Sequence, residues 1–449
     1  MIDDARRRIL AVVALAFLLL VGGGCAAHRA SLDAVTAALR RGDATAALAT
    51  YESSRRDQGD LLFQMEHGHL LHIAGRWEES NAAFEEAERI ARELYTKSIS
   101  REAVALLTTD LALPYRGMPY ELQLIHYYRA LNYLELRKTD DALVEARKAN
   151  LELSQYASGE EDTALRQDAF LQYFTGLLYA SAGEWNDALV SYRTARELYG
   201  KYEEEYALPV PGCLERDLAR TSNRIAIASE RNGQDDVAPN VILFLESGYV
   251  PFRTSVELNF PVFEDGGGEA WDRAGRYFDR YGADPYRYAY REPSVHHVLR
   301  VAFPRLVELP PEVRSIEVVA AAGDTVRSIQ ALDLARVAWA EFNARRPAML
   351  LRTVARALAK EVARASADRE AHGLGVLVNI LGAASEQADT RGWVLLPGRI
   401  DLVQVHLPPG RANLSIRFRS ASGSLLEERR LEFDVPARGS FFAAVRCFR

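Results

Sequence analysis

Residues 31–236 carry apolar side chains at helical spacing, and one pattern of small and large residues occurs there three times. In each copy a small residue is followed by a bulky residue three positions on, then by further small or aromatic residues twelve, sixteen and nineteen positions on. The copies are Gly68, Leu71, Gly75, Ser80, Phe84, Ala87; Ala130, Tyr133, Ala142, Ala146, Ala149; and Gly176, Tyr179, Gly183, Ala188, Tyr192, Ala195. Small residues let two helices approach closely, while large residues one turn away fill the space beside the contact. The pattern therefore predicts pairs of antiparallel helices.

This pattern resembles the tetratricopeptide repeat, whose helix pairs stack into an array with a concave, partner-binding surface. The resemblance implies that certain positions on the first helix of each pair line that surface. We expect eight of them to form a partner-binding groove: Met65, His69, His72, Tyr127, Leu131, Phe170, Tyr173 and Leu177. An open apolar groove of this size would be a sticky patch on a monomer. Either an external partner or the chain's own second half therefore covers it.

From residue 237 onward, short alternating or apolar runs bounded by glycine and proline replace the helical period. Such runs are typical of β-strands, and we expect them at 241–245, 255–258, 299–303, 315–320, 400–407, 412–419, 425–433 and 440–447. Helical spacing returns at 333–343 and 349–365. An apolar, glycine-interrupted stretch at 373–384 is too short to cross a bilayer and is interpreted as core, with a membrane-touching segment as the alternative.

The predicted fold class is α+β: an N-terminal all-α array followed by a mixed, β-rich C-terminal domain with an internal helical block. The length of 449 residues favours two domains, a helical repeat domain at 31–236 and a mixed domain at 237–449. With 48% hydrophobic and 26% charged residues, the chain is neither largely disordered nor a polytopic membrane protein. Its formal net charge of −7 argues against nucleic acid as a partner.

The N-terminus predicts export. Arg6–Arg8 precede an apolar run, Ile9–Val21, that is too short to span a bilayer. Gly22–Gly24 then lead into Cys25, which resembles the bacterial lipobox, although Gly22 replaces the usual branched residue. The resemblance implies a signal peptide at 1–24, acylation of Cys25 and a lipidated tether at 25–30. A signal cleaved after Ala26 or Ala27, or an uncleaved anchor, is the alternative; Ala26 in place of aspartate favours the outer membrane, facing the periplasm.

Several segments resemble a family of uncharacterised bacterial repeat lipoproteins. They are Arg116–Glu121, Tyr128–Leu134, Glu246–Pro251, Phe260–Val262, Arg356–Lys360 and Ala388–Trp393 with Leu396–Pro397. Members of that family are sometimes encoded beside lipoproteins resembling activators of penicillin-binding proteins. The resemblance thus implies an envelope role linked to cell-wall synthesis, but it supplies no catalytic residue.

A search for reactive motifs finds no Gly-x-Ser-x-Gly, no Walker loop, no His-Glu-x-x-His and no Cys-x-x-Cys. We therefore expect no catalytic residue, no metal and no cofactor. Asp389, Arg391 and Trp393 form the one candidate C-terminal site, for an anion or a sugar; an ion pair that anchors a loop is the competing interpretation. Cys213 and Cys447 are expected to be separate buried thiols rather than a disulfide.

These features together predict a membrane-anchored adaptor of the cell envelope that binds an unknown envelope protein through the groove. The alternative is an envelope hydrolase or glycan-binding protein with its site around Asp389, Arg391 and Trp393. A third hypothesis is a structural lipoprotein whose groove is filled by its own chain.

Overall fold

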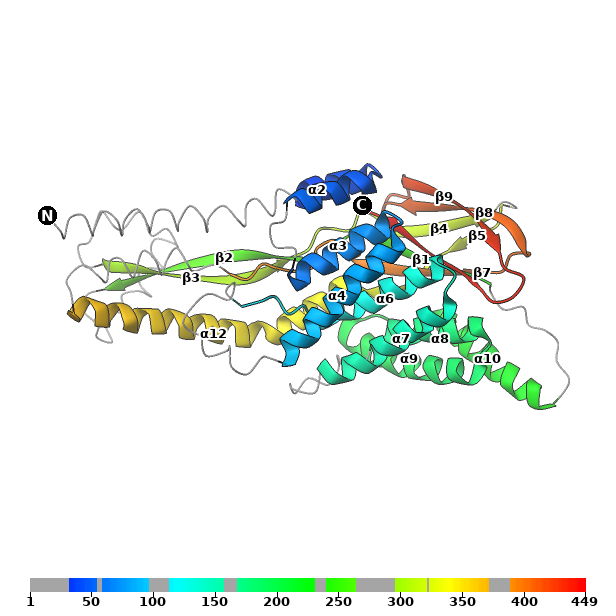
Figure 1. The fold of residues 1–449 in the computed structure, drawn as a ribbon, viewed down its shortest axis with the longest axis horizontal. Helices are drawn as coiled ribbons and strands as arrows, with labels where there is room; N and C mark the ends of the chain where they lie inside the picture. The colour runs from blue at the N-terminus through cyan, green and yellow to red at the C-terminus, as the bar shows by residue number, and fades with distance from the viewer. Residues whose placement is uncertain are drawn as a thin grey trace.

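The computed structural model describes residues 32–54, 59–96, 113–156, 168–230, 240–263, 295–320, 323–370 and 388–449 (Figure 1). Within these ranges the fold is mixed α+β, as the sequence predicts. Cys25, the segments 1–24 and 25–30, and the apolar stretch 373–384 lie outside the described residues.

The first half of the described chain is helical. Residues 32–40 are helical, and the helices that follow are α2 (Ala44–Ser54), α3 (Leu61–Ile73), α4 (Trp77–Thr96), α6 (Pro119–Glu135), α7 (Thr139–Tyr156), α8 (Ala169–Ala182), α9 (Trp185–Tyr206) and α10 (Gly212–Glu230). Helices α3 and α4, α6 and α7, and α8 and α9 pack as successive pairs joined by short turns. None of the described helices has the length and apolar character needed to cross a membrane.

Two glycines allow close packing within these pairs. A Cβ atom at Gly68 would lie 2.9 Å from the ring of Phe84, and one at Gly176 would lie 2.5 Å from the ring of Tyr192. Gly183 ends α8 in the left-handed conformation, with φ of 83°, which glycine adopts without a steric penalty. The small and large residues of the sequence pattern therefore meet across the helix pairs.

The second half contributes strands and one long helix. The elements are β1 (Val241–Ser247), β2 (Phe252–Phe263), β3 (Val295–Val307), β4 (Ser315–Ala320), β5 (Thr325–Arg327), β6 (Ile329–Asp333), α12 (Leu334–Glu370), β7 (Arg399–Val405), β8 (Gly410–Arg419), β9 (Leu425–Val435) and β10 (Phe441–Cys447). One sheet has the order β10-β1-β7-β6 and a second the order β5-β4-β8-β9, while β2 and β3 form an antiparallel hairpin.

Strand β1 lies at the centre of the molecule and is buried along its whole length. Ile242 and Phe244 belong to the core shared with the helices, whereas Val241, Leu243 and Leu245 belong to a second core between the two sheets. Successive side chains of a strand point to opposite faces, so a strand covered on both faces is apolar throughout. This explains the continuous apolar run of β1.

The predicted domains 31–236 and 237–449 are not separated by independent cores. Buried residues of the helices and of β1, β6, β7, β10 and α12 form one hydrophobic cluster. The molecule is thus a helical layer, a central sheet and an outer sheet, held together by contacts distant in sequence.

An arm extends from this body and consists of the β2–β3 hairpin and α12 (Figure 1). The sequence predicts two helices, at 333–343 and 349–365, but the structure has one helix that continues through Pro347. A proline removes its own backbone hydrogen bond, and the exposed position of Pro347 leaves its ring in solvent rather than in a packed contact.

Candidate functional site

The predicted groove residues are covered by the chain itself, and three of them, Tyr127, Phe170 and Tyr173, contact its central sheet. Seven are buried, with 0–3% of their surface exposed, and His72 is half-buried. The ring of Phe244 on β1 meets Tyr127, Phe170 and Phe174 edge-on, at centroid distances of 6.0, 6.0 and 5.2 Å. The sequence analysis left open whether an external partner or the chain's own second half covers these residues. In the structure the second half of the chain covers them. The seven buried residues are Met65, His69, Tyr127, Leu131, Phe170, Tyr173 and Leu177.

Polar contacts join the array to the sheet at Tyr173. Its hydroxyl donates to Asp217 Oδ2 at 2.6 Å, and the amide of Gln404 on β7 donates to the same carboxylate oxygen at 2.7 Å. Burial raises the pKa of Asp217, although these two hydrogen bonds and the nearby arginines oppose the rise. Tyr173 therefore positions the end of α10 and strand β7 and is closed to an external ligand.

A second polar group lies where β1 meets α6. Tyr128 donates to Glu246 Oε2 at 3.2 Å, and Arg446 Nε lies 3.9 Å from the same atom. Arg446 also donates to the carbonyl of Gly248 at 2.6 Å. Burial raises the pKa of Glu246, while Arg446 favours its charged form. The buried Glu246 carboxylate thus connects strands β1 and β10 to helix α6.

His69 and His72 occupy different environments. Nδ1 of His72 lies 2.6 Å from Asn132 Oδ1, whereas neither ring nitrogen of His69 has a hydrogen-bond partner among the described residues. The ring of His69 packs 4.3 Å from Tyr128 and 5.6 Å from Trp393, measured between centroids. Burial lowers the pKa of both histidines. His69 is therefore a neutral ring packed among aromatic side chains.

Asp389, Arg391 and Trp393 do not converge on one site. Arg391 forms a two-pronged ion pair with Asp389, at 2.9 and 2.8 Å, and its guanidinium lies 5.5 Å from the ring centre of Tyr115. Trp393 points into the core with 1% of its surface exposed. This arrangement matches the loop-anchoring interpretation of the ion pair.

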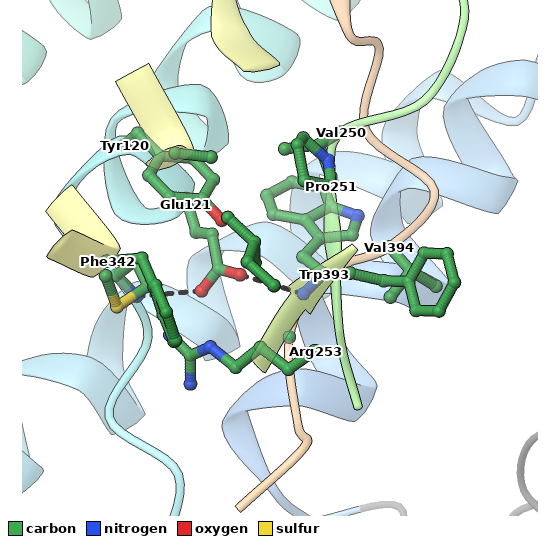
Figure 2. Close-up of a pocket in the computed structure, with 13 residues that line it drawn as sticks. Tyr120, Glu121, Val250, Pro251, Arg253, Phe342, Trp393 and Val394 are labelled. Carbon is green, nitrogen blue, oxygen red and sulfur yellow. Dashed lines mark hydrogen bonds between the residues drawn. The ribbon is translucent and has the colours of Figure 1, made fainter. Parts of the chain in front are cut away.

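Glu121 is the residue that holds this loop, and the sequence analysis did not single it out as a site. Its Oε1 accepts from the backbone nitrogen of Trp393 at 2.8 Å (Figure 2). Its Oε2 accepts from the backbone nitrogen of Met118 at 2.7 Å and from the hydroxyl of Tyr115 at 2.5 Å. The signal in the sequence was the position of Glu121 in the first turn after Pro119, where a glutamate caps a helix.

A small cavity of about 10 Å³ lies beside Glu121, lined also by Arg253, Phe342 and Trp393 (Figure 2). This volume suffices for about one water molecule. Next to Phe342, the side chain of Glu341 is buried, and burial raises its pKa to about 8. Neither Arg253 nor Glu341 was identified from the sequence, because both lie against Tyr120 and Glu121, more than a hundred residues away; only Arg345 is near Glu341 in the chain.

Four of the segments that carry the lipoprotein resemblance meet in this region. Glu121, which ends the segment Arg116–Glu121, binds Trp393 at the end of Ala388–Trp393. Tyr128, which begins the segment Tyr128–Leu134, binds Glu246 at the start of Glu246–Pro251. These four segments therefore meet where the helices, the sheet and the 388–393 loop join.

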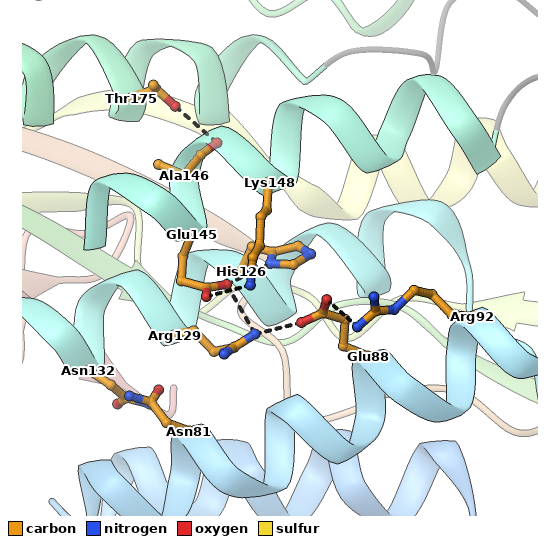
Figure 3. A network of polar contacts seen from close by, with 10 residues as sticks. All are labelled: Asn81, Glu88, Arg92, His126, Arg129, Asn132, Glu145, Ala146, Lys148 and Thr175. Atoms are coloured by element: carbon orange, nitrogen blue, oxygen red, sulfur yellow. Dashed lines mark hydrogen bonds and ion pairs between the residues drawn. The ribbon is translucent and has the colours of Figure 1, made fainter. Parts of the chain in front are cut away.

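Glu88, His126 and Glu145 form a second cluster that the sequence did not predict (Figure 3). Their ligand atoms lie within 4.8 Å of one another, close enough in principle for a metal ion. However, Arg129 Nη1 lies 2.6 Å from Glu88 and 3.1 Å from Glu145, so a guanidinium already supplies the positive charge. Burial favours a raised pKa at Glu145, but His126, Arg129 and Lys148 together hold it below its ordinary value. The cluster is a buried ion network that joins α4, α6 and α7.

Cys213 and Cys447 are both free and buried, as predicted. Burial raises the pKa of both thiols, which keeps them in the less reactive protonated form.

The chain has no match among protein-family models and none among curated protein sequences.

Proposed function

We propose that this protein is a lipid-anchored adaptor of the bacterial cell envelope that binds another envelope protein and catalyses no reaction. The observation that carries the proposal is that the candidate site residues are engaged in contacts within the chain. The cavity beside Glu121 has room for a water molecule but not for a substrate, and the larger hollow of about 430 Å³ beside Trp185 contains none of these candidate residues. These residues therefore pack the chain against itself, and in this proposal the partner binds an exposed surface elsewhere.

The helical array is proposed to be tetratricopeptide-like. Support comes from the contacts of Gly68 with Phe84 and of Gly176 with Tyr192, which are the small-to-large contacts that the repeat pattern requires. Further support comes from β1, an extended segment that lies against the predicted groove residues. In this proposal the array holds its own sheet where related arrays hold a partner, and the partner binds an outer surface.

The anchor and the location rest on the N-terminal sequence. Acylation of Cys25 would attach the chain to the outer membrane, facing the periplasm. The resemblance to repeat lipoproteins supports a partner involved in cell-wall synthesis. Nucleic acid is not proposed as a partner, because the net charge is −7.

Photo-crosslinking in intact cells tests the adaptor role. A photoreactive residue is placed at Val144 or Val190, which are 46% and 62% exposed on α7 and α9, and at the buried Tyr173 for comparison. We expect an exposed position to capture one envelope protein, which should not be captured from position 173. The same protein, once purified, should also bind the purified chain. The proposal would be contradicted if neither exposed position captured a protein. It would also be contradicted if the purified chain turned over peptidoglycan fragments.

A further inference from the structure

The arm carries an apolar surface on the outer face of α12. Leu351, Val354 and Leu358 are 72%, 50% and 58% exposed, and Pro347 is exposed on the same face. Their spacing of four, three and four residues places them in one line along a helix. We call these four residues the α12 stripe.

The opposite face of α12 packs on the protein. Thr353, Arg356 and Ala357 are buried there, and α12 contacts strand β3. Nearer the body, Val337, Ala338 and Phe342 are buried in turn. The helix is thus apolar toward solvent only in its outer part, where it follows the arm (Figure 1).

The charge along the stripe is mainly positive, and Glu361 is the first acidic residue after it. Residues 344–360 include five basic and no acidic residues: Arg345, Arg346, Arg352, Arg356 and Lys360. Arg346 and Arg352 are exposed. A second copy of α12 would bring like charges together, so the stripe is poorly suited to self-association.

We propose that the α12 stripe binds the surface of an anionic lipid bilayer. A helix with an exposed leucine-rich face and neighbouring arginines lies in the headgroup region, with its apolar side chains in the acyl boundary and its cations near the phosphates. A line of four side chains is short for a stable protein interface but adequate for a membrane contact. The contact is independent of the proposed adaptor role and would lay the arm along the membrane.

The test uses the full chain with a photoreactive residue at position 351, added to vesicles of phosphatidylglycerol or of phosphatidylcholine. The matched control carries the same residue at position 425, because Leu425 is a 49% exposed leucine on β9, outside the arm. We expect lipid adducts from position 351 in phosphatidylglycerol, at least about tenfold fewer in phosphatidylcholine, and only background from position 425. An acyl anchor would bring the whole chain to the vesicle whether position 351 or position 425 carries the photoreactive residue. It therefore does not explain more adducts from position 351 than from position 425.

A second variant separates contact from folding. Leu351→Glu combined with Leu358→Glu removes the apolar face at exposed positions. It should reduce the lipid adducts formed by a photoreactive residue at position 354 in phosphatidylglycerol about tenfold or more, with an unchanged melting temperature. Leu425→Glu should leave these adducts unchanged. Adducts from position 351 only to the chain itself, to a second copy or to another protein would overturn the proposal, as would equal labelling in both lipids.

Discussion

Gly176 shows how a single residue sets the distance between two helices. Its replacement by alanine puts a methyl group 2.5 Å from the ring of Tyr192, so the helices or the ring must move. We expect Gly176→Ala to lower the free energy of unfolding by about 1–3 kcal/mol. Gly200 on α9 is the matched control, since a Cβ there meets no atom within 4 Å. Gly200→Ala should raise stability by about 0.5–1 kcal/mol in the same urea titration, and equal effects of the two variants would contradict the packing.

Glu341 makes stability depend on pH. The unfolded carboxyl ionises near its ordinary pKa of 4.5, whereas the folded one keeps its proton until about pH 8 because it is buried. The folded state therefore loses stability relative to the unfolded state as pH rises from about 4.5 to about 8. The glutamine variant has no such charge, so Glu341→Gln should gain stability over the native chain across this window, by up to about 1.4 kcal/mol per pH unit.

Urea unfolding at pH 5 and pH 8 measures this difference between the native and Glu341→Gln chains. Glu432→Gln removes the same charge from an exposed ion pair with Arg411 and serves as the control. A constant difference between Glu341→Gln and the native chain at both pH values would contradict a protonated Glu341.

The sequence was informative at residue scale where neighbours in the chain determine the outcome. The glycines and alanines of the repeat pattern predict the helix contacts because their spacing is fixed by the helical period. Arg253, Glu341 and Arg446 could not be identified in this way. Their environments are created by residues from other elements, and hydrophobic periodicity contains no information on which elements meet.

Among the elements, α6 and the 388–393 loop are joined through one side chain. Glu121 accepts hydrogen bonds from Tyr115, Met118 and Trp393, and its carboxylate is buried. Glu121→Ala leaves buried donors without an acceptor, so we expect a loss of about 2–5 kcal/mol in the free energy of unfolding. Glu121→Gln keeps one carbonyl oxygen and should lose less.

Glu184, the residue before α9, is the matched control for Glu121. It lies at the corresponding end of its helix but makes no capping hydrogen bond from its side chain and contacts Arg147 only in an exposed ion pair. Glu184→Ala should therefore change stability by less than about 1 kcal/mol. If Glu121→Ala were equally mild, the carboxylate would not be holding the loop.

At the scale of elements, most strands and helices follow from the hydrophobic pattern, whereas the short strands β5 and β6 and the single helix α12 were not predicted. Helical spacing predicted two helices, at 333–343 and 349–365, but the structure has one helix that continues through the exposed Pro347. The sequence places Leu350, Val354, Leu358 and Val362 at helical spacing, which predicts a helix but not which of its faces is buried. In the structure Val354 and Leu358 are exposed.

The whole molecule is organised around one shared core. Phe244 on the central sheet is 0% exposed and packs against rings from α6 and α8. We expect one unfolding transition, in which helical circular dichroism and tryptophan fluorescence coincide. Phe244→Ala should lower both midpoints together, with a loss of about 3–5 kcal/mol, whereas Leu425→Ala at an exposed position should change stability by less than about 0.5 kcal/mol. Two separate transitions would instead indicate independent domains.

The predicted division into domains at residue 237 marks a change in secondary structure rather than a break in packing. Length and a shift in pattern suggested two cores, because sequence statistics treat long chains as series of domains. The residues predicted to line a partner-binding groove are, except for His72, buried in this shared core. What covers them could not be derived from the sequence, since it depends on long-range pairing of the array with β1 and β7.

The most direct test of this account is whether the array lies against its own sheet in living cells. Ser440, just before β10, donates its backbone N–H to Ser181 Oγ on α8 at 2.9 Å. The chain carrying Ser181→Cys and Ser440→Cys, treated with a short bismaleimide in intact cells, should form an intrachain cross-link in most molecules. Neither single variant should form that product. Absence of the cross-link in the double variant, or cross-linking of position 181 to another protein instead, would contradict a groove filled by the chain itself.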